Sequence, residues 1–204
     1  MRIGIDFDNT LIGYDAVFLT AARARGLVNG ALPDGASKQQ IRDCIRRLDD
    51  GERRWQQLQG FVYGAGIGGA VLIEGAARFL QRSAAAGHEV FIVSHKTEFG
   101  HHDRARVNLR HAALGWIEER GLFEDGRYGL NVARVFFEAT RAEKLQRIAR
   151  LGCTHFIDDL EEVLTDPEFP AGVTRLLLGR PAGMAAAPCL SCPTWGDVEA
   201  AVFA

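Results

Sequence analysis

The 204-residue sequence lacks several features that would each point to a particular class of protein. No apolar run reaches the roughly 20 residues that a membrane-spanning helix needs, because glycine, arginine or histidine interrupts the longest candidates. The formal net charge is only -2, which gives no general attraction to nucleic acid or to an anionic membrane surface. We therefore expect neither nucleic acid nor a membrane among the partners of this protein.

Cysteine is also scarce, with four residues in the chain. Only Cys189 and Cys192 have ligand-like spacing. A structural zinc site needs four ligands, and no second Cys-x-x-Cys or paired histidine follows at suitable spacing. A thioredoxin-type pair would begin a helix after a strand, whereas this pair lies in a tail rich in proline, glycine and alanine. We interpret the pair as part of a loop.

The N-terminus leaves no room for a leader, because the chain passes from Met1-Arg2 directly into an apolar stretch. We therefore expect no signal peptide and a cytoplasmic location. Hydrophobic residues make up 47% of the chain and charged residues 25%, as in an ordinary globular protein. The length fits one medium domain, or a core domain that carries a smaller insertion.

From residue 76 onward, apolar segments of strand length alternate with segments of helical periodicity. Strands separated by helices predict right-handed crossovers and a parallel sheet covered on both faces. The sequence therefore predicts an α/β fold, a three-layer Rossmann-like sheet with helices on both faces. After a first strand near residues 3–5, strands are expected at 90–93, 135–137, 155–157 and 173–178, and helices at 76–86, 109–120, 142–151 and 197–202.

The segment between the first strand and residue 76 reads as helical and is rich in arginine. Most of these arginines are expected to be solvated, while one or two could face an anionic ligand. A G-x-G-x-x-G pattern begins at Gly64, but no clear strand precedes it, so we interpret it as a hinge that returns the chain to the core. Helices are expected at 15–25, from an N-cap at Ser37 to about residue 50, and at 52–59.

The chain is organised around residues 3–11, with the sequence IGIDFDNTL. A short apolar run leads into Asp6 and Asp8, and ligands in open α/β sheets bind beyond the carboxyl ends of such strands. Two carboxylates a few ångströms apart repel unless a cation or a proton lies between them, and Mg²⁺ prefers such oxygen ligands. The alternative is a solvated turn in which Asp8 or Asn9 caps the following helix.

Polar residues stand at other strand ends as well. Ser94 follows the strand at 90–93, Lys144 lies just after a later strand, and Asp158 and Asp159 follow the strand at 155–157. Their order, in the stretches IDFDNTL, VSHKT, RAEKLQ and FIDDL, resembles the haloacid dehalogenase (HAD) superfamily. The four motifs span nearly the whole chain, and their combination is quite specific although each is common alone.

These residues also suit phosphoryl transfer without the resemblance. Asp6 can act as a carboxylate nucleophile that forms an aspartyl-phosphate. Mg²⁺ held by the acids of the first and last motifs would let an anionic nucleophile approach an anionic phosphate. Lys144 adds a positive charge, and the hydroxyl of Ser94 can donate to a phosphoryl oxygen.

The resemblance implies the same roles and adds others. Asp8 would give its backbone carbonyl to the metal, while its side chain protonates the leaving oxygen and later activates water. Thr10 would steady the turn. Substrate contacts are expected from Asn9, Thr10, His95 and Lys96.

Some assignments stay open. Lys144 could be an exposed lysine on a helix surface, although Thr140 and Glu143 place it in the first turn of its helix. Ser94 could cap the next helix. Of Asp158 and Asp159, one is expected to bind the metal directly and the other through water, and the sequence does not decide which.

In the HAD superfamily, segments between the first and second motifs form a mobile cap over the site. Residues 14–69 occupy that place and are expected to form a small helical, C1-type cap, with residues 1–13 and 70–204 as the catalytic core. A cap that closes excludes water and large polymers, which favours small phosphorylated metabolites. Glu74-Gly75 stands where Pro-Gly often occurs.

We therefore expect a Mg²⁺-dependent phosphatase that hydrolyses a small-molecule phosphate monoester through an aspartyl-phosphate, as a monomer or homodimer. A phosphomutase shares all four motifs and is the alternative. A non-catalytic binding protein on the same fold is another, but such a protein needs neither Asp6 nor Asp8. The chain has no basic, aromatic-interleaved strip that would indicate a nucleic-acid phosphatase.

Overall fold

The structure, a computed structural model, describes residues 1–28, 30, 32–102 and 105–204. The chain divides into two compact units, each built from segments that are not contiguous in sequence. Unit 1 comprises Met1–Ile12, Leu72–Lys96 and Arg120–Ala204, and unit 2 comprises Gly13–Val71 and Thr97–Glu119. Among the described residues, no helix is both long and apolar enough to cross a bilayer.

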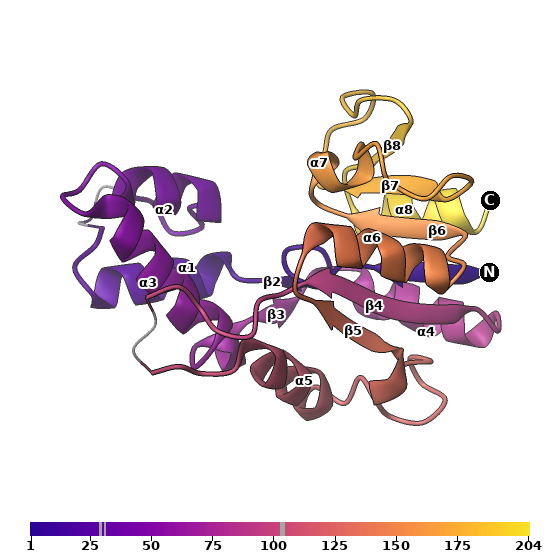
Figure 1. Ribbon diagram of the computed structural model, residues 1–204, viewed down its shortest axis with the longest axis horizontal. Helices are drawn as coiled ribbons and strands as arrows, with labels where there is room; N and C mark the ends of the chain where they lie inside the picture. The colour runs from indigo at the N-terminus through magenta and orange to yellow at the C-terminus, as the bar shows by residue number, and fades with distance from the viewer. Residues whose placement is uncertain (29, 31, 103–104) are drawn as a thin grey trace. The chain divides into compact units, whose positions relative to one another are not determined.

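Unit 1 contains a six-stranded sheet in the order β5-β4-β1-β6-β7-β8, and all of its neighbouring strands pair in parallel (Figure 1). The first strand of the sequence therefore lies inside the sheet, between β4 and β6. This confirms the predicted Rossmann-like parallel sheet. The strands are β1 (Arg2–Ile5), β4 (Glu89–His95), β5 (Val135–Glu138), β6 (His155–Asp158), β7 (Thr174–Leu178) and β8 (Cys189–Cys192).

Helices cover both faces of this sheet, as predicted: α6 lies on one face, and α4 and α8 lie on the other (Figure 1). The alternation of side chains along β4 explains the packing, because Phe91 and Val93 share one face and join a buried cluster with Leu145 and Ile148 of α6. The helices of unit 1 are α4 (Ala76–Ala85), α6 (Arg141–Arg150), α7 (Glu161–Leu164) and α8 (Trp195–Val202), with a 3₁₀ turn, η2, at Val132–Arg134.

Two glycines of unit 1 are required by close packing. A Cβ at Gly4 in β1 would lie 2.5 Å from Cδ2 of Phe156 on the neighbouring strand. Gly75 precedes α4 with a φ of +89°, and a Cβ there would lie 2.8 Å from the Cβ of Trp195. Gly75 thus lets the start of α4 approach α8 closely, which explains the glycine of the Glu74-Gly75 pair.

Unit 2 is helical, and aromatic side chains fill its core. The ring of Phe18 stacks on Trp55 with centroids 5.0 Å apart, and Tyr14 meets Tyr63 edge to face at 4.9 Å. Ser37 caps its helix in a capping box with Gln40, which confirms the predicted N-cap. The helices are α1 (Asp15–Ala24), α2 (Lys38–Ile45), α3 (Gly51–Tyr63) and α5 (Leu109–Glu119), with a 3₁₀ turn, η1, at Ile67–Gly69.

Two boundaries in unit 2 differ from the sequence pattern. The helix that begins after Ser37 ends at Ile45 rather than near residue 50, and a new helix begins at Gly51 after Asp50, which has a left-handed φ of 54°. The segment Thr97–Glu119, which the pattern places in the core, belongs to unit 2. There Trp116 Nε1 donates to the carbonyl of Ala70 at 3.2 Å, a contact between segments far apart in sequence. A cap function for this region stays a prediction.

The interpretation of Cys189 and Cys192 as part of a loop was wrong. They begin and end the edge strand β8, which pairs with β7 in parallel, and both side chains are buried thiols without a disulfide. The local composition does not indicate a strand, and the segment becomes one because it pairs with the apolar strand β7. Two further short strands, β2 (Ile12–Gly13) and β3 (Val71–Leu72), pair with each other.

Candidate active site

The predicted site residues of unit 1 lie at the carboxyl ends of neighbouring strands. Asp6 directly follows β1, Asp158 is the last residue of β6, and Ser94 is the penultimate residue of β4. Because β1 pairs in parallel with both β4 and β6, these ends share one edge of the sheet. The chain builds β4 and β5 on one side of β1 before it crosses to β6 on the other side. The residues therefore stand where the strand order reverses, which is where open α/β sheets bind ligands.

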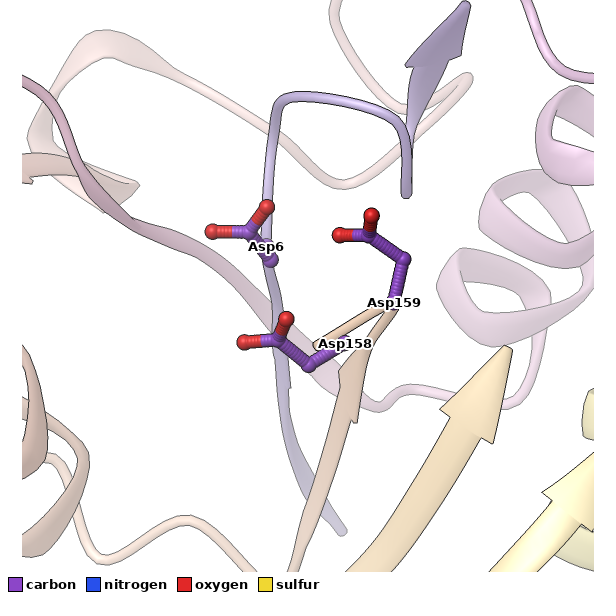
Figure 2. Close-up of side chains that lie close together, drawn as sticks. All are labelled: Asp6, Asp158 and Asp159. Atoms are coloured by element: carbon purple, nitrogen blue, oxygen red, sulfur yellow. The ribbon is translucent and has the colours of Figure 1, made fainter. Parts of the chain in front are cut away.

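Three carboxylates come together at this edge, those of Asp6, Asp158 and Asp159 (Figure 2). Each offers one oxygen, and these oxygens all lie within 4.8 Å of one another. Asp6 and Asp158 are buried, and Asp159 is half-buried. Hard divalent cations take carboxylate oxygens as ligands, so this set of donors fits Mg²⁺. The side chain of Asp8 is not part of the cluster, and a metal contact through its backbone carbonyl stays a prediction.

Lys144 lies among the acids. Its Nζ is 2.6 Å from Oδ1 of Asp6 and 2.6 Å from Oδ2 of Asp158, and the residue is only 2% exposed. Thr140 and Glu143 form a capping box that starts α6 three residues before Lys144, which fixes the lysine in the first turn. The alternative of an exposed lysine on the helix surface is therefore excluded.

Burial and charge act against each other in this group. Burial raises the pKa of Asp6 to about 6; Lys144 opposes the rise and Asp158 adds to it. For Lys144, burial lowers the pKa, but the attraction of Asp158 and Asp6 outweighs it, so the pKa of this ammonium is raised. With Asp6, Asp158 and Asp159 all ionised, three carboxylates and one ammonium leave two net negative charges, which a divalent cation would balance.

A second lysine binds the other aspartate of the first motif. Lys96 is 3% exposed, and its Nζ lies 2.7 Å from Oδ2 and 3.1 Å from Oδ1 of Asp8. The backbone N–H of Lys96 donates to the carbonyl of Glu138 at 2.9 Å, which ties the residue to β5. Lys96 was expected to contact substrate, and the structure places its ammonium on the predicted acid/base residue.

Thr10 joins the first motif to the last. Its Oγ1 donates to Oδ1 of Asp159 at 3.2 Å and accepts from the backbone N–H of Asp159 at 3.1 Å. Trp195 Nε1 donates to the carbonyl of Thr10 at 3.1 Å from inside the core. Asn9, directly before Thr10 in the turn that follows β1, has a left-handed φ of 61°. These contacts agree with a steadying role for Thr10. The sequence carries no signal for Trp195, which lies 185 residues away from Thr10.

The remaining predicted residues, Ser94 and His95, lie at the end of β4. Ser94 is buried at the end of β4, in register with Phe137 of β5. His95 is exposed, and its Nε2 lies 3.0 Å from the carbonyl of Ala139, to which it can donate. Substrate contacts by Asn9, Thr10, His95 and Lys96 stay predictions.

Neither a protein-family model nor a curated protein sequence matches this chain at a significant level. Solved structures do match it. A HAD family hydrolase from Deinococcus radiodurans with bound phosphate and sodium is 16% identical, with 98% of this chain and 94% of that chain covered and a TM-score of 0.55. A predicted phosphoglycolate phosphatase from Haemophilus somnus is 12% identical, with 98% and 96% covered and a TM-score of 0.56.

A third similar structure is that of protein tyrosine kinase A from Mycobacterium tuberculosis. It is 12% identical to this chain, with 100% of this chain and 98% of that chain covered and a TM-score of 0.66. Identities this low show a shared fold. The chain therefore has the fold of HAD-superfamily hydrolases, as the four motifs predict.

Proposed function

We propose that this protein is a HAD-type, Mg²⁺-dependent phosphatase that hydrolyses a small-molecule phosphate monoester. The observation that carries the proposal is the buried contact of Lys144 with both Asp6 and Asp158, inside a cluster of three carboxylates at the strand ends. Such a concentration of acids fits a divalent cation and an anionic substrate. The shared fold with a predicted phosphatase and with a phosphate-bound hydrolase supports it.

Asp6 is the nucleophile in this proposal. Its carboxylate attacks phosphorus, the bond from phosphorus to the leaving oxygen breaks, and an aspartyl-phosphate forms. Lys144 contacts Asp6 and thereby holds the nucleophile in place while it stabilises the ionised carboxylate. Bound Mg²⁺, held by Asp6, Asp158, Asp159 and the carbonyl of Asp8, would neutralise charge on the phosphoryl oxygens.

Asp8 handles the protons in both steps. In the first step it gives a proton to the leaving oxygen, and in the second it takes one from the water that attacks the aspartyl-phosphate, which releases phosphate and restores Asp6. The ammonium of Lys96 donates to the carboxylate of Asp8. This contact orients the side chain of Asp8 and stabilises the ionised carboxylate that the second step needs.

The proposed substrate is a small phosphorylated metabolite, and the proposed location is the cytoplasm. All four cysteines are free thiols, as expected for a reducing compartment. Phosphoryl transfer back to a bound sugar, as in a phosphomutase, would use the same residues, so the products must distinguish the two reactions.

The test is a panel of phosphorylated metabolites incubated with the full chain, with and without Mg²⁺. We expect at least one monoester to release inorganic phosphate only when Mg²⁺ is present. The quenched wild-type protein should gain the mass of one phosphoryl group, whereas Asp6→Asn should show neither this adduct nor turnover. An isomerised sugar phosphate without free phosphate would indicate a phosphomutase. Binding of substrates without any turnover would indicate a binding protein.

A further inference from the structure

Unit 2 contains a pocket of about 380 Å³ with a positively charged rim. Three arginines, Arg25, Arg53 and Arg54, line it together with Gln57 and a single acid, Asp50. All of these residues belong to unit 2. Positive charge therefore exceeds negative charge around the pocket, although the chain as a whole has a formal net charge of -2.

The position of two of these arginines adds to the positive potential. Arg53 and Arg54 lie in the first turn of α3 or directly after it, near the positive end of the helix dipole, where cations are unfavourable and anions are stabilised. Glu52, the acid of the same turn, binds Arg46 at 2.6 Å. Two cations at a helix N-terminus break a local rule of helix design, and an anion in the pocket would compensate for it.

Arg25 is held in place beside them. Its guanidinium carbon lies 3.8 Å from the ring centroid of Phe61, and its Nη1 donates to the carbonyl of Ala21 at 3.3 Å. A guanidinium has five donors in a fixed plane, so these contacts leave donors for an oxyanion. Stacking on an aromatic ring orients the group before any ligand arrives.

Among the described residues, most of the other arginines form ion pairs with acids. Arg23 meets Asp34 at 2.6 Å and Arg147 meets Glu138 at 2.6 Å. Within the part of the chain that the structure describes, none of the three pocket arginines forms an ion pair within 4.0 Å. No acid of the described residues therefore neutralises these three guanidinium groups within that distance, in contrast to the paired arginines.

We propose that the pocket of Arg25, Arg53 and Arg54 binds a phosphate-type oxyanion, either free or as the phosphate group of a larger molecule. Guanidinium groups bind phosphate oxygens through paired, charge-assisted hydrogen bonds. The volume of about 380 Å³ falls within the range of small-ligand pockets. This site lies wholly in unit 2 and does not depend on the proposed phosphatase activity.

The test is an NMR titration of the full ¹⁵N-labelled chain in about 150 mM NaCl, a concentration that screens weak, diffuse attraction. Inorganic phosphate and phenylphosphonate are the two probes. We expect saturable amide shifts at Gly26 and along Asp50–Leu58, with dissociation constants weakened on the order of ten-fold in Arg53→Gln and in Arg54→Gln. The matched control is Arg47→Gln, an exposed arginine of unit 2 that does not line the pocket.

The relative affinity of the two probes distinguishes an organic phosphate from the free ion, and two results would overturn the proposal. Tighter binding of phenylphosphonate would indicate an organic phosphate, and tighter binding of inorganic phosphate would indicate the free ion. The proposal is overturned if neither probe gives saturable shifts at these residues, or if Arg47→Gln weakens binding as much as the pocket variants. The amide spectra themselves show whether each variant is folded.

Discussion

The ammonium of Lys96 lies 2.7 Å from Oδ2 of Asp8, in an ion pair whose lysine side chain is almost completely buried. Asp6 meets a different lysine, Lys144, at 2.6 Å. The two aspartates of the first motif are therefore bound by separate cations that come from separate parts of the sequence. This division agrees with two different roles, a nucleophile and an acid/base residue.

We predict that Lys96 contributes to catalysis through its contact with Asp8. Lys96→Met should lower turnover by about ten-fold or more for an alkyl phosphate, because Asp8 loses the group that orients its carboxylate. In an Asp8→Asn background the same change should have little further effect, since the partner is already altered. Steady-state kinetics of the wild type, the two single variants and the double variant give a double-mutant cycle that measures the coupling between Lys96 and Asp8. Independent, multiplicative losses would show that Lys96 does not act through Asp8.

Lys144 is predicted to stabilise the metal-free fold. Lys144→Met leaves Asp6 and Asp158 buried without their cation, and removal of one partner from a buried pair typically costs about 3–5 kcal/mol. Urea unfolding in EDTA measures the free energy of unfolding. Arg150→Met, an exposed position on the same helix, serves as the control and should change it by less than about 0.5 kcal/mol. If Lys144→Met lowers the free energy of unfolding no more than the control does, a group other than Lys144 compensates the negative charge of Asp6 and Asp158.

The local pattern of the sequence was sufficient to predict the positions of Asp6 and Asp158 at strand ends and of Lys144 in the first turn of a helix. An apolar run followed by Asp6, and another followed by Asp158, indicates two strand ends, and parallel strands bring such ends to one edge. The capping box of Thr140 and Glu143 places Lys144 by short-range geometry alone.

Contacts across long sequence separations were not predictable in the same way. The partner of Lys96 is 88 residues away, and the hydrogen bond of Trp195 to Thr10 joins a C-terminal helix to the first motif. No periodicity records such pairings, because they depend on how elements pack. The edge strand at Cys189–Cys192 was not predicted for the same reason. It pairs with β7, which is distant from the local sequence pattern, and its own composition does not favour a strand.

Metal dependence is predicted from the three clustered carboxylates. EDTA should remove activity and Mg²⁺ should restore it, whereas recovery with zinc alone would contradict the assignment. Asp158→Asn and Asp159→Asn should both raise the Mg²⁺ concentration that gives half-maximal activity, and the direct ligand should show the larger increase. Asp125→Asn, an exposed acid of unit 1, should leave this concentration unchanged.

The acid/base role of Asp8 is predicted to depend on the leaving group. Asp8→Asn keeps the backbone carbonyl for the metal but removes the proton donor, and general acid–base assistance is typically worth ~10²- to 10⁴-fold. Turnover should fall by about that range for a poor leaving group such as a sugar alkoxide. The loss should be smaller for p-nitrophenyl phosphate, because p-nitrophenolate leaves with little protonation. Asp6→Asn supplies the contrast, since loss of the nucleophile should abolish turnover of both substrates. Equal losses for the two substrates in Asp8→Asn would show that Asp8 acts through the fold or the metal, and the proton-transfer role would then be withdrawn.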